Sequence, residues 1–352
     1  MTYGVRITPD DNGKSIILDG GARYISYLAS VSMNGIDRSR AVKTMPSGAT
    51  ALIVPRRLVS IFPSTTQVPQ FYYITGMSLS GGTFAYSVNS GAENVVNEIG
   101  YCDVFSVAGA AAPGGYGIRI VNGANFLEVS DTSYLGYVTW RGTVDINTYW
   151  QIPDAVLSLG TYVVFARWNN TDTPLYLNRD NNRIECYNAF ASASGSAVGG
   201  SISGVQICIV SCGFSPALPA SGYGLVIRNA SGVITYSSRY PPVMWRDCGY
   251  NFSGYSNFDT STGEVLSWTN PTGNVSLPMI PLCSIGLQRG DFGRNASSYS
   301  FRQVLYSGFK MSGNSVSSAR AKAAGSDAPV SMFVKAMQVP CYLPCLDAAD
   351  YF

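Results

Sequence analysis

Apolar and polar residues alternate over short stretches along most of the chain, which is the pattern of half-buried β-strands. The clearest case opens the sequence, where Val5 and Ile7 fall on one strand face and a second apolar run, Ile16–Leu18, follows a polar turn. That turn contains Asn12-Gly13, and Asn-Gly between two apolar runs predicts a β-hairpin because its central residues need positive φ. We therefore predict that the chain opens with a β-hairpin.

The same pattern occurs three times. Similar five-residue runs begin the copies, at Tyr3-Gly4-Val5-Arg6-Ile7, Tyr116-Gly117-Ile118-Arg119-Ile120 and Tyr223-Gly224-Leu225-Val226-Ile227. Each run precedes a turn, a second apolar run and a further tyrosine, and the last two copies then carry an aromatic-basic pair, Trp140-Arg141 and Trp245-Arg246. The copies start about one domain length apart, on the order of 100 residues. We predict three tandem related β-sandwich domains at 1–113, 114–220 and 221–352, each opening with a hairpin.

Further short strands between turn residues complete each copy and predict an all-β fold. In the first two copies we place them at 24–33, 51–62, 71–79, 83–88, 100–107, 134–146, 161–168, 175–178, 183–190 and 204–211. Asn178–Asn182 is interpreted as a hairpin turn, and the Ser/Gly/Ala-rich stretch Ser192–Gly204 as a flexible loop. The best helix candidate is the short stretch Ser317–Ala324.

Charge is scarce in this chain. Only 12% of residues are charged and the net charge is +2, so no electrostatic footprint for nucleic acid or an anionic membrane is visible. The densest basic cluster, Arg38, Arg40, Lys43, Arg56 and Arg57, is interpreted as a solvated loop face, with a binding patch as the alternative. No apolar stretch is long enough to cross a bilayer, and the first residues enter a strand without an apolar signal region. We expect synthesis in a cytosol, no nucleic-acid partner and no membrane insertion.

The absence of histidine argues against most catalytic chemistry. It removes Ser-His and Cys-His pairs, His-ligated metals and the commonest general base. The eight cysteines lack Cys-x-x-Cys spacing, so we expect buried apolar thiols and no metal or cofactor, with a later disulfide left open. A two-carboxylate glycosidase stays possible, and the acids to inspect are Asp247, Asp259, Glu264 and Asp291, whose ordinary role is a solvated loop carboxylate.

The third copy is longer than the others and holds the best candidate for a binding surface. Within residues 248–273, aromatic rings stand among Ser, Gly, Asn and Thr, as in antibody binding loops and in sites for sugar rings. The candidate ligand- or receptor-binding residues are Tyr250, Phe252, Tyr255, Phe258 and Trp268. The alternative is that half of these rings pack onto the sandwich. The C-terminal stretch 347–352 is expected to fray, with docking on a neighbouring subunit as the alternative.

The opening stretch, residues 3–35, resembles small proteins encoded with the tail-tip and tail-fibre genes of long-tailed bacteriophages. Those proteins often begin with Met-x-Tyr-Gly, here Met1-Thr2-Tyr3-Gly4, followed by an Ile-rich hairpin with an acidic, Asn-rich turn. The resemblance covers the first copy's opening and is echoed at residues 116 and 223. It implies a virion structural protein at the distal tail, oligomeric and in contact with the host surface, and it brings no catalytic residues. The triplication departs from the single-domain members.

Together these patterns lead us to expect a non-enzymatic virion structural protein of a phage tail tip or tail fibre that attaches to the host surface. It would be assembled in the host bacterial cytoplasm, with the first domain on the virion and the third facing outward. Expected partners are other phage tail proteins, further copies of the chain (a homo-oligomer, such as a trimer) and a host cell-surface glycan or protein. Two alternatives are a purely architectural tail or capsid decoration protein and a polysaccharide-degrading tail enzyme.

Overall fold

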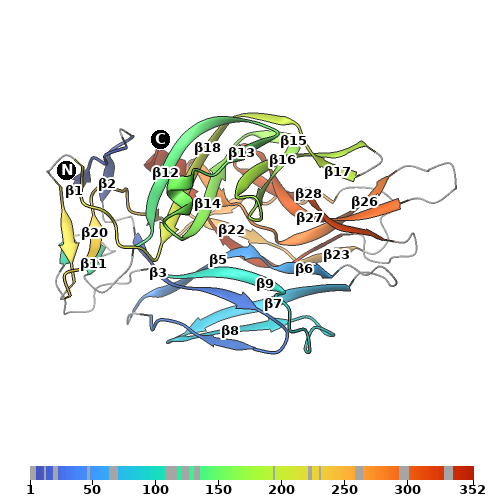
Figure 1. The fold of residues 1–352 in the computed structure, drawn as a ribbon, viewed down its shortest axis with the longest axis horizontal. Coiled ribbons are helices and arrows are strands. Elements are labelled where there is room, and N and C mark those ends of the chain that lie inside the picture. Colours follow the sequence, from blue (N-terminus) through green and yellow to red (C-terminus); the bar gives the residue numbers. More distant parts are fainter. Residues whose placement is uncertain are drawn as a thin grey trace.

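A computed structural model describes residues 5–11, 13–18, 23–45, 48–62, 70–107, 117–120, 127–130, 135–192, 195–220, 224–229, 231–257, 265–292, 301–328 and 336–352. Within these ranges the chain is nearly all strand, arranged in several antiparallel sheets (Figure 1). The helical elements of the described part are the short α1 (Asp154–Leu157) and a 3-10 turn (Ala348–Asp350). The prediction of an all-β chain is confirmed.

Three separate two-stranded hairpins open the three predicted copies. They are β1 (Val5–Ile7) with β2 (Ile16–Leu18), β10 (Gly117–Ile120) with β11 (Leu127–Ser130), and β19 (Val226–Arg228) with β20 (Ile234–Ser237). Strands of all three hairpins lie at the same end of the molecule, beside the N-terminus (Figure 1). The predicted hairpins are therefore confirmed, and the fold gathers them although they are far apart in sequence.

The first copy also supplies most of two four-stranded sheets. One has the order β21-β3-β9-β5, from Met244–Trp245, Arg23–Met33, Gly100–Val107 and Thr50–Arg57. The other has the order β4-β8-β7-β6, from Ser39–Ala41, Thr83–Val88, Gln70–Ser80 and Val59–Phe62. A strand predicted to run from 51 to 62 is thus two strands, because the chain breaks at Leu58 and the halves enter different sheets.

A 14-stranded sheet combines the second and third copies. The second copy contributes β12 (Tyr137–Asn147), β13 (Tyr149–Gln151), β14 (Thr161–Arg167), β15 (Asn170–Asn178), β16 (Arg183–Ser192), β17 (Gly195–Val198) and β18 (Ser201–Cys212). The third copy contributes β23 (Tyr255–Asn257), β25 (Pro278–Pro281), β26 (Gly286–Phe292), β27 (Phe301–Ser312), β28 (Ser315–Ala328), β29 (Ala336–Gln338) and β31 (Leu346–Asp347). A small sheet of β24 (Pro271–Thr272), β22 (Gly249–Phe252) and β30 (Cys341–Pro344) completes the third copy.

These sheets cross the predicted domain boundaries. Strand β14 of the second copy pairs with β25 of the third, β15 pairs with β27, and β21 of the third copy pairs with β3 of the first. The boundaries near residues 113 and 220 therefore do not separate the sheets. We call residues 1–113, 114–220 and 221–352 the first, second and third segments below, and they share one continuous core.

The three segments meet in a closed ring of strand pairings. Ser26 of the first segment pairs with Leu135 of the second, Tyr137 of the second with Pro242 of the third, and Met244 of the third with Tyr24 of the first. All three pairings are antiparallel, and in each segment the two positions used are two residues apart. Each segment therefore contacts the other two through corresponding backbone positions.

Between the two paired positions of each segment lies one further residue: Ile25, Gly136 and Val243. Backbone hydrogen bonds link these three residues as well. The backbone N–H of Gly136 donates to the carbonyl of Ile25 at 3.1 Å, and the N–H of Val243 donates to the carbonyl of Gly136 at 2.9 Å. A Cβ atom added to Gly136 would lie 3.4 Å from side-chain atoms of both Ile25 and Val243. The buried side chains of Ile25 and Val243 therefore pack directly against Gly136.

Both arginines of the predicted aromatic-basic pairs bind the C-terminal stretch, and Arg141 also binds the first hairpin. Arg141, whose side chain is only 4% exposed, donates two hydrogen bonds to Asp11 in the turn of the first hairpin, and a third to the carbonyl of Tyr351. Arg246 makes a similar two-point contact with Asp350. Such paired guanidinium–carboxylate bonds fix geometry as well as charge. The C-terminus is consequently bound to the second segment and to the hairpin end.

Three local predictions are wrong. The stretch Ser317–Ala324, expected to be helical, lies inside strand β28, because pairing with β27 outweighs the weak helix propensity of a short segment. The stretch Ser192–Gly204, expected to be a flexible loop, contains β17 and the start of β18. The C-terminal stretch does not fray: Tyr351 is buried, and its hydroxyl accepts a hydrogen bond from the N–H of Met244 at 2.9 Å.

Candidate functional site

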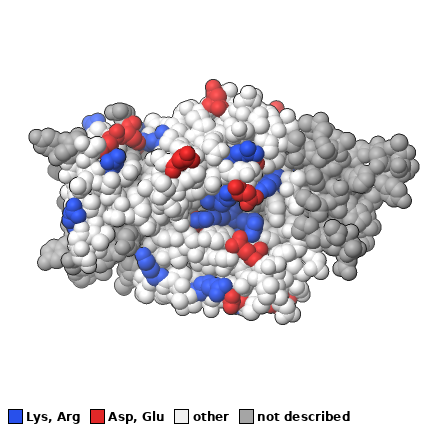
Figure 2. Space-filling model, viewed as in Figure 1, with Lys and Arg blue, Asp and Glu red and all other residues white. Residues whose placement is uncertain are grey.

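A solvent-accessible pocket of about 440 Å³ lies where the three segments meet. Its lining comes from the first segment (Arg56, Arg57, Glu98 and Tyr101), the second (Tyr176, Leu177, Arg179 and Asp180) and the third (Tyr306, Lys322, Ala323 and Ala324). Charged side chains are sparse on the face of the molecule in Figure 2, and Lys and Arg side chains gather near its middle, with acidic side chains beside them. We call this site the junction pocket.

Arg56 and Arg57 both line the pocket because the end of strand β5 is irregular. In a regular strand, consecutive side chains point to opposite faces. Here Pro55 pairs with Cys102 and Arg57 with the preceding Tyr101, so Arg56 is an extra residue, as in a β-bulge. Ser284 of the third segment supports this irregular stretch, with its N–H bonded to the carbonyl of Arg56 at 3.1 Å.

Arg56 has its charge compensated inside the protein. Its Nε and Nη2 atoms each lie 2.6 Å from an oxygen of Asp103, whose side chain is completely buried. Ser30 donates a further hydrogen bond to the same carboxylate at 2.6 Å, and the ring of Tyr101 lies 4.6 Å below the guanidinium carbon. Burial acts to lower the pKa of Arg56, but Asp103 outweighs it and raises that pKa above the ordinary value. Arg56 is therefore a fixed cation in the pocket wall.

Arg57 is only partly satisfied by its neighbours. Its Nη2 atom donates to Glu98 at 2.7 Å, and Ser32 holds the other oxygen of that carboxylate. The Nε atom of Arg57 is buried and has no hydrogen-bond partner among the described residues. A buried donor without an acceptor costs on the order of 1–3 kcal/mol, so Arg57 is held in this wall of the pocket in an unfavourable setting.

Arg179 is the pocket cation for which the described residues supply no carboxylate partner. It is half-buried, and its guanidinium lies 4.9 Å from the ring of Tyr162 and donates to the Tyr162 carbonyl at 3.2 Å. Within the described ranges it forms no ion pair. Burial, and then repulsion from Arg56, lower the pKa of Arg179 to about 10. The fold thus holds the Arg179 guanidinium at a position where burial and the neighbouring Arg56 disfavour its positive charge.

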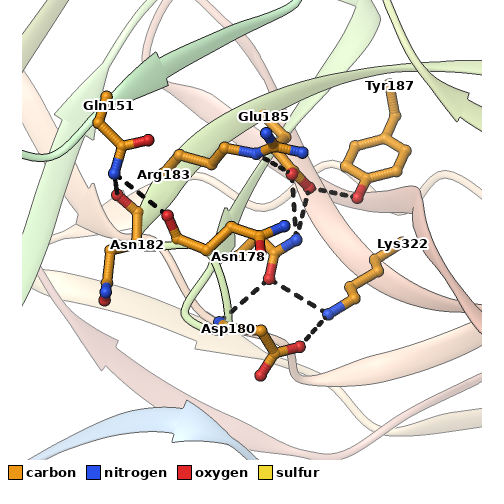
Figure 3. A network of polar contacts seen from close by, with 9 residues as sticks. Gln151, Asn178, Asp180, Asn182, Arg183, Glu185, Tyr187 and Lys322 are labelled. Carbon is orange, nitrogen blue, oxygen red and sulfur yellow. Dashed lines mark hydrogen bonds and ion pairs between the residues drawn. The ribbon is translucent and has the colours of Figure 1, made fainter.

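Lys322 completes the cationic lining from the third segment. Its Nζ atom lies 2.5 Å from Asp180 and 3.2 Å from the side-chain oxygen of Asn178 (Figure 3). The amide of Asn178 in turn donates to both oxygens of Glu185, at 3.0 and 3.1 Å. A buried polar network therefore begins directly behind this wall of the pocket.

The network around Glu185 follows from strand alternation. Arg183, Glu185 and Tyr187 are two residues apart on β16 and share one face, and Asn178 is paired with Arg183 on the neighbouring strand β15. Both Arg183 and the Tyr187 hydroxyl donate to the buried carboxylate. Burial raises the pKa of Tyr187, and its hydrogen bond to Glu185 raises it further, so the phenol stays a protonated donor. Four donated bonds satisfy Glu185 (Figure 3).

Tyrosines supply much of the remaining pocket surface, together with Leu177, Ala323 and Ala324. Tyr101, Tyr176 and Tyr306 come from the three different segments and all line the pocket. The hydroxyl of Tyr306 accepts a hydrogen bond from the N–H of Ile61 at 3.1 Å, so its position is fixed by the first segment. Flat rings beside fixed charged groups form a surface suited to a small polar ring that carries a charge.

The charges in the junction pocket nearly balance, but not completely. Asp103 offsets Arg56, Glu98 offsets Arg57 and Asp180 offsets Lys322. Arg179 remains, so the pocket carries one positive charge that no ion pair offsets among the described residues. Such an arrangement can bind one negative charge. No Asp, Glu, Cys or His cluster in the described part of the chain has the make-up of a metal site.

The aromatic residues predicted for binding do not form one surface. Tyr250 and Phe252 are buried, with the Tyr250 hydroxyl bonded to the carbonyl of Asn314 and the Phe252 ring 5.9 Å from that of Phe309. These two rings belong to the core, as the alternative interpretation expected for half of the set. Burial also raises the pKa of Tyr250.

The other three predicted residues are placed differently. Tyr255 is half-buried and exchanges hydrogen bonds with Gln288 and Val265. Trp268 is 40% exposed, so among the described members of the set it is the ring that a ligand could reach most easily. Phe258 lies outside the described residues. Strand pairing decides this placement, because β22 puts Tyr250 and Phe252 between neighbouring strands rather than in a free loop.

Of the four acids considered for glycoside hydrolysis, only Asp247 has a described side chain. Asp247 lines a second pocket of about 580 Å³ between the first and third segments, together with Trp245 and Tyr342. Asp259 and Glu264 lie outside the described residues, and the side chain of Asp291 does as well. The two carboxylates that the junction pocket presents, Glu98 and Asp180, are each held by a cation.

The cysteines agree with the prediction of buried apolar thiols. Seven of the eight are buried, Cys341 is partly exposed, and all are free. Burial raises the pKa of the Cys186 thiol to about 12 and that of Cys341 likewise to about 12, which keeps both protonated and unreactive at neutral pH.

Sequence reasoning identified only part of the junction pocket. Arg56 and Arg57 belong to the densest basic cluster of the sequence, whose expected role is a solvated loop face. Arg179 and Asp180 were recognised as a hairpin turn, which is correct, since residues 179–182 form the β15–β16 turn and Asn182 has a φ of 51°. Lys322 falls in the stretch that the sequence predicts to be helical. One further feature of the sequence could have pointed to the pocket: because only 12% of residues are charged, any cluster of charged residues is unusual.

The chain is thus an all-β protein whose three segments close around a ring of strand pairings and share a cationic pocket. A model for a family of unknown function (DUF6453) matches residues 4–328, which is most of the chain. The chain belongs to this family. Neither a search of curated proteins nor a search of solved structures found a match. Within the described residues, no helix is long and apolar enough to span a membrane.

Proposed function

We propose that this chain is a non-enzymatic structural protein of a phage virion, located in the tail tip or tail fibre, that also attaches to the host surface. It is assembled in the host bacterial cytoplasm and functions on the released particle. The resemblance of its opening stretch to proteins encoded with tail-tip and tail-fibre genes suggests the location. The histidine-free, charge-poor composition fits a structural role.

The observation that carries this proposal is the closed ring of pairings Ser26–Leu135, Tyr137–Pro242 and Met244–Tyr24. It supports three related β-sandwich units arranged around a pseudo-threefold axis within one chain. Such a chain offers three similar hairpins at one end, as three subunits of a trimer would. A chain of this kind suits a position against a partner with threefold symmetry, and this is how we expect it to bind other tail proteins.

The hairpin positions suggest a different orientation of the molecule in the virion from the one that the sequence suggests. The sequence alone suggested the first segment on the tail and the third facing outward. Hairpins from all three segments lie at one end, so we propose that this end attaches to the virion and that the side bearing the junction pocket faces the host. A host cell-surface glycan or protein is then the partner at the junction pocket.

The first test locates the chain on the particle. Gold-labelled antibodies against the purified protein should mark the distal tail of intact virions in negative-stain electron microscopy. Labelling of the capsid would overturn the tail assignment in favour of capsid decoration. Labelling that appears only after the virions are disrupted would favour a purely architectural, buried tail protein.

The second test concerns attachment and catalysis. The purified chain should sediment with intact bacteria of the host that the phage infects, and should release no reducing sugar from the polysaccharide of that host. A variant with Arg179→Gln should sediment less, whereas Arg40→Gln, at an exposed ion pair with Asp37, should behave as the native chain. Release of reducing sugar would instead identify a tail enzyme.

A further inference from the structure

We infer that the junction pocket binds an acidic saccharide that carries a single negative charge on its sugar ring, of the uronic acid kind. This inference rests on the proposed attachment function for its biological setting, but the site itself is argued from the pocket. Its anchor is Arg179, its second contact is Arg57, and its walls are tyrosines from all three segments.

The single positive charge of the pocket that the described residues leave unpaired favours a ligand with a single negative charge. Three of its four cations have a carboxylate partner, and Arg179 has none among the described residues. A single negative charge would complete the balance. A ligand with two negative charges in close proximity would be opposed by Glu98 and Asp180, which also line the pocket. This favours a carboxylate or another monoanionic group over a phosphate monoester.

The arginine N–H donors of the pocket favour a ligand group that has more than one hydrogen-bond acceptor. A guanidinium has five N–H donors in a fixed fork, and Arg179 uses one of them on the carbonyl of Tyr162. Arg57 also lines the pocket, and 33% of its side chain is exposed, so its guanidinium can approach the same ligand. A carboxylate has two oxygens, and guanidinium–carboxylate contacts commonly use both.

The size and walls of the pocket select a small ring. A volume of about 440 Å³ lies in the range of small-ligand sites, and it is large enough for one or two sugar residues. Tyr101, Tyr176 and Tyr306 offer ring faces and hydroxyl groups, which suit the mixed apolar and polar faces of a saccharide. A bare inorganic anion would leave most of this surface unused.

The pocket is held in shape before any ligand binds. Arg56 is fixed by Asp103, Lys322 by Asp180 and Asn178, and Tyr306 by the N–H of Ile61. Because the wall residues need no reordering, little conformational entropy is lost on binding. The unfavourable placement of Arg179 is the part that a ligand would relieve.

The inference can be tested on the purified full-length chain with D-galacturonate, using D-galactose as the neutral counterpart of the same ring. Isothermal titration calorimetry at low ionic strength should detect galacturonate binding that weakens as salt is added, and galactose should bind at least ~10-fold more weakly. Arg179→Gln should weaken galacturonate binding by at least ~10-fold, as expected for loss of a charge-assisted contact. Arg40→Gln, an exposed arginine outside the pocket, is the matched control and should bind as the native chain.

Three outcomes would overturn the inference. Equal binding of galactose and galacturonate would remove the role of charge. Sulfate binding as tight as that of galacturonate would show a simple anion site without saccharide recognition. Unchanged galacturonate binding by a folded Arg179→Gln variant, judged by its circular dichroism melting curve, would show that Arg179 is not the anchor.

This test is independent of the proposed virion role. Galacturonate binding by a protein that antibodies do not find on the tail would keep the pocket assignment and reject the tail proposal. Tail labelling without galacturonate binding would do the reverse. The two readouts therefore fail separately.

Discussion

Two polar regions that adjoin each other satisfy their charges in opposite ways. Around Glu185, a completely buried carboxylate accepts four hydrogen bonds from Asn178, Arg183 and Tyr187 (Figure 3). Around Arg179, one residue along from Asn178, a half-buried cation makes a single bond to a carbonyl and lacks a carboxylate within the described residues. Both regions are built on the same pair of strands, β15 and β16, and their turn.

The difference between these regions indicates what each is for. A buried charge is stable only if hydrogen bonds and an opposite charge replace the water it has lost. Glu185 meets that condition inside the protein and so supports folding. Arg179 does not, and polar groups held in an unfavourable setting occur often at binding sites. We therefore expect substitutions at Glu185 to change stability and substitutions at Arg179 to change binding.

The largest effect is expected for Glu185→Ala. Removing this carboxylate leaves Arg183 without its counter-charge and Asn178 without its acceptor in a buried site. The free energy of unfolding should fall by about 3–5 kcal/mol. Urea unfolding followed by tryptophan fluorescence measures this change. Asp180→Ala is the control, since Asp180 is 80% exposed and its pair with Lys322 should contribute less than about 1 kcal/mol. A similar loss in both variants would contradict the comparison.

Asp347 offers a second satisfied carboxylate, with a pH dependence that can be measured. Burial acts to raise its pKa, but hydrogen bonds from the backbone N–H groups of Ser276, Ala349 and Leu277 outweigh burial and hold the pKa below the ordinary 3.8. Its stabilisation is thus complete above pH 3.8 and is lost as the pH falls through the lower folded-state pKa.

Asp347→Asn should therefore lower the free energy of unfolding by about 2 kcal/mol at pH 7. The difference between the native chain and the variant should shrink as the pH is lowered past 3.8, because both then carry a neutral side chain. Urea unfolding at pH 7 and at two acidic values tests this. A difference that stays constant from neutral to acidic pH would show that the charge of Asp347 does not contribute.

Arg179→Met is expected to act in the opposite direction. Methionine keeps an apolar side chain over the ring of Tyr162 but removes a charge that burial and Arg56 disfavour. The free energy of unfolding should rise by about 1 kcal/mol, because replacing a poorly compensated, half-buried charge with an apolar group removes its desolvation cost. Thermal unfolding should show a raised midpoint, while galacturonate binding is lost. A lowered midpoint would mean that Arg179 supports the fold, as Glu185 does.

The smallest effect is expected for Arg40→Gln. Arg40 pairs with Asp37 at 2.7 Å, but both side chains are 43% exposed, so water and salt screen the pair. The free energy of unfolding should change by less than about 0.5 kcal/mol. The same urea series as for Glu185 measures it. A larger loss would show that surface pairs in this charge-poor chain contribute more than is usual.

The sequence by itself determined the strand content and the repeated hairpins. Strict alternation, as at Val5 and Ile7, needs only local chemistry to mark one strand face, and Asn12-Gly13 needs only its backbone freedom to mark a turn. These signals act over a few residues, which is why β1–β2 and its two counterparts were found with nearly the right bounds. The turn at 179–182 was found for the same reason.

The tertiary structure decided everything that depends on long-range pairing. Ser317–Ala324 is a strand because β27 lies beside it, and Tyr250 and Phe252 are buried because β22 lies between two other strands. The junction pocket is the strongest case, since Arg57, Arg179 and Lys322 come from three segments with no common motif. These side chains come together because of the ring of strand pairings. The local sequence of a strand does not show which distant strand it will pair with, since every strand offers the same backbone donors and acceptors.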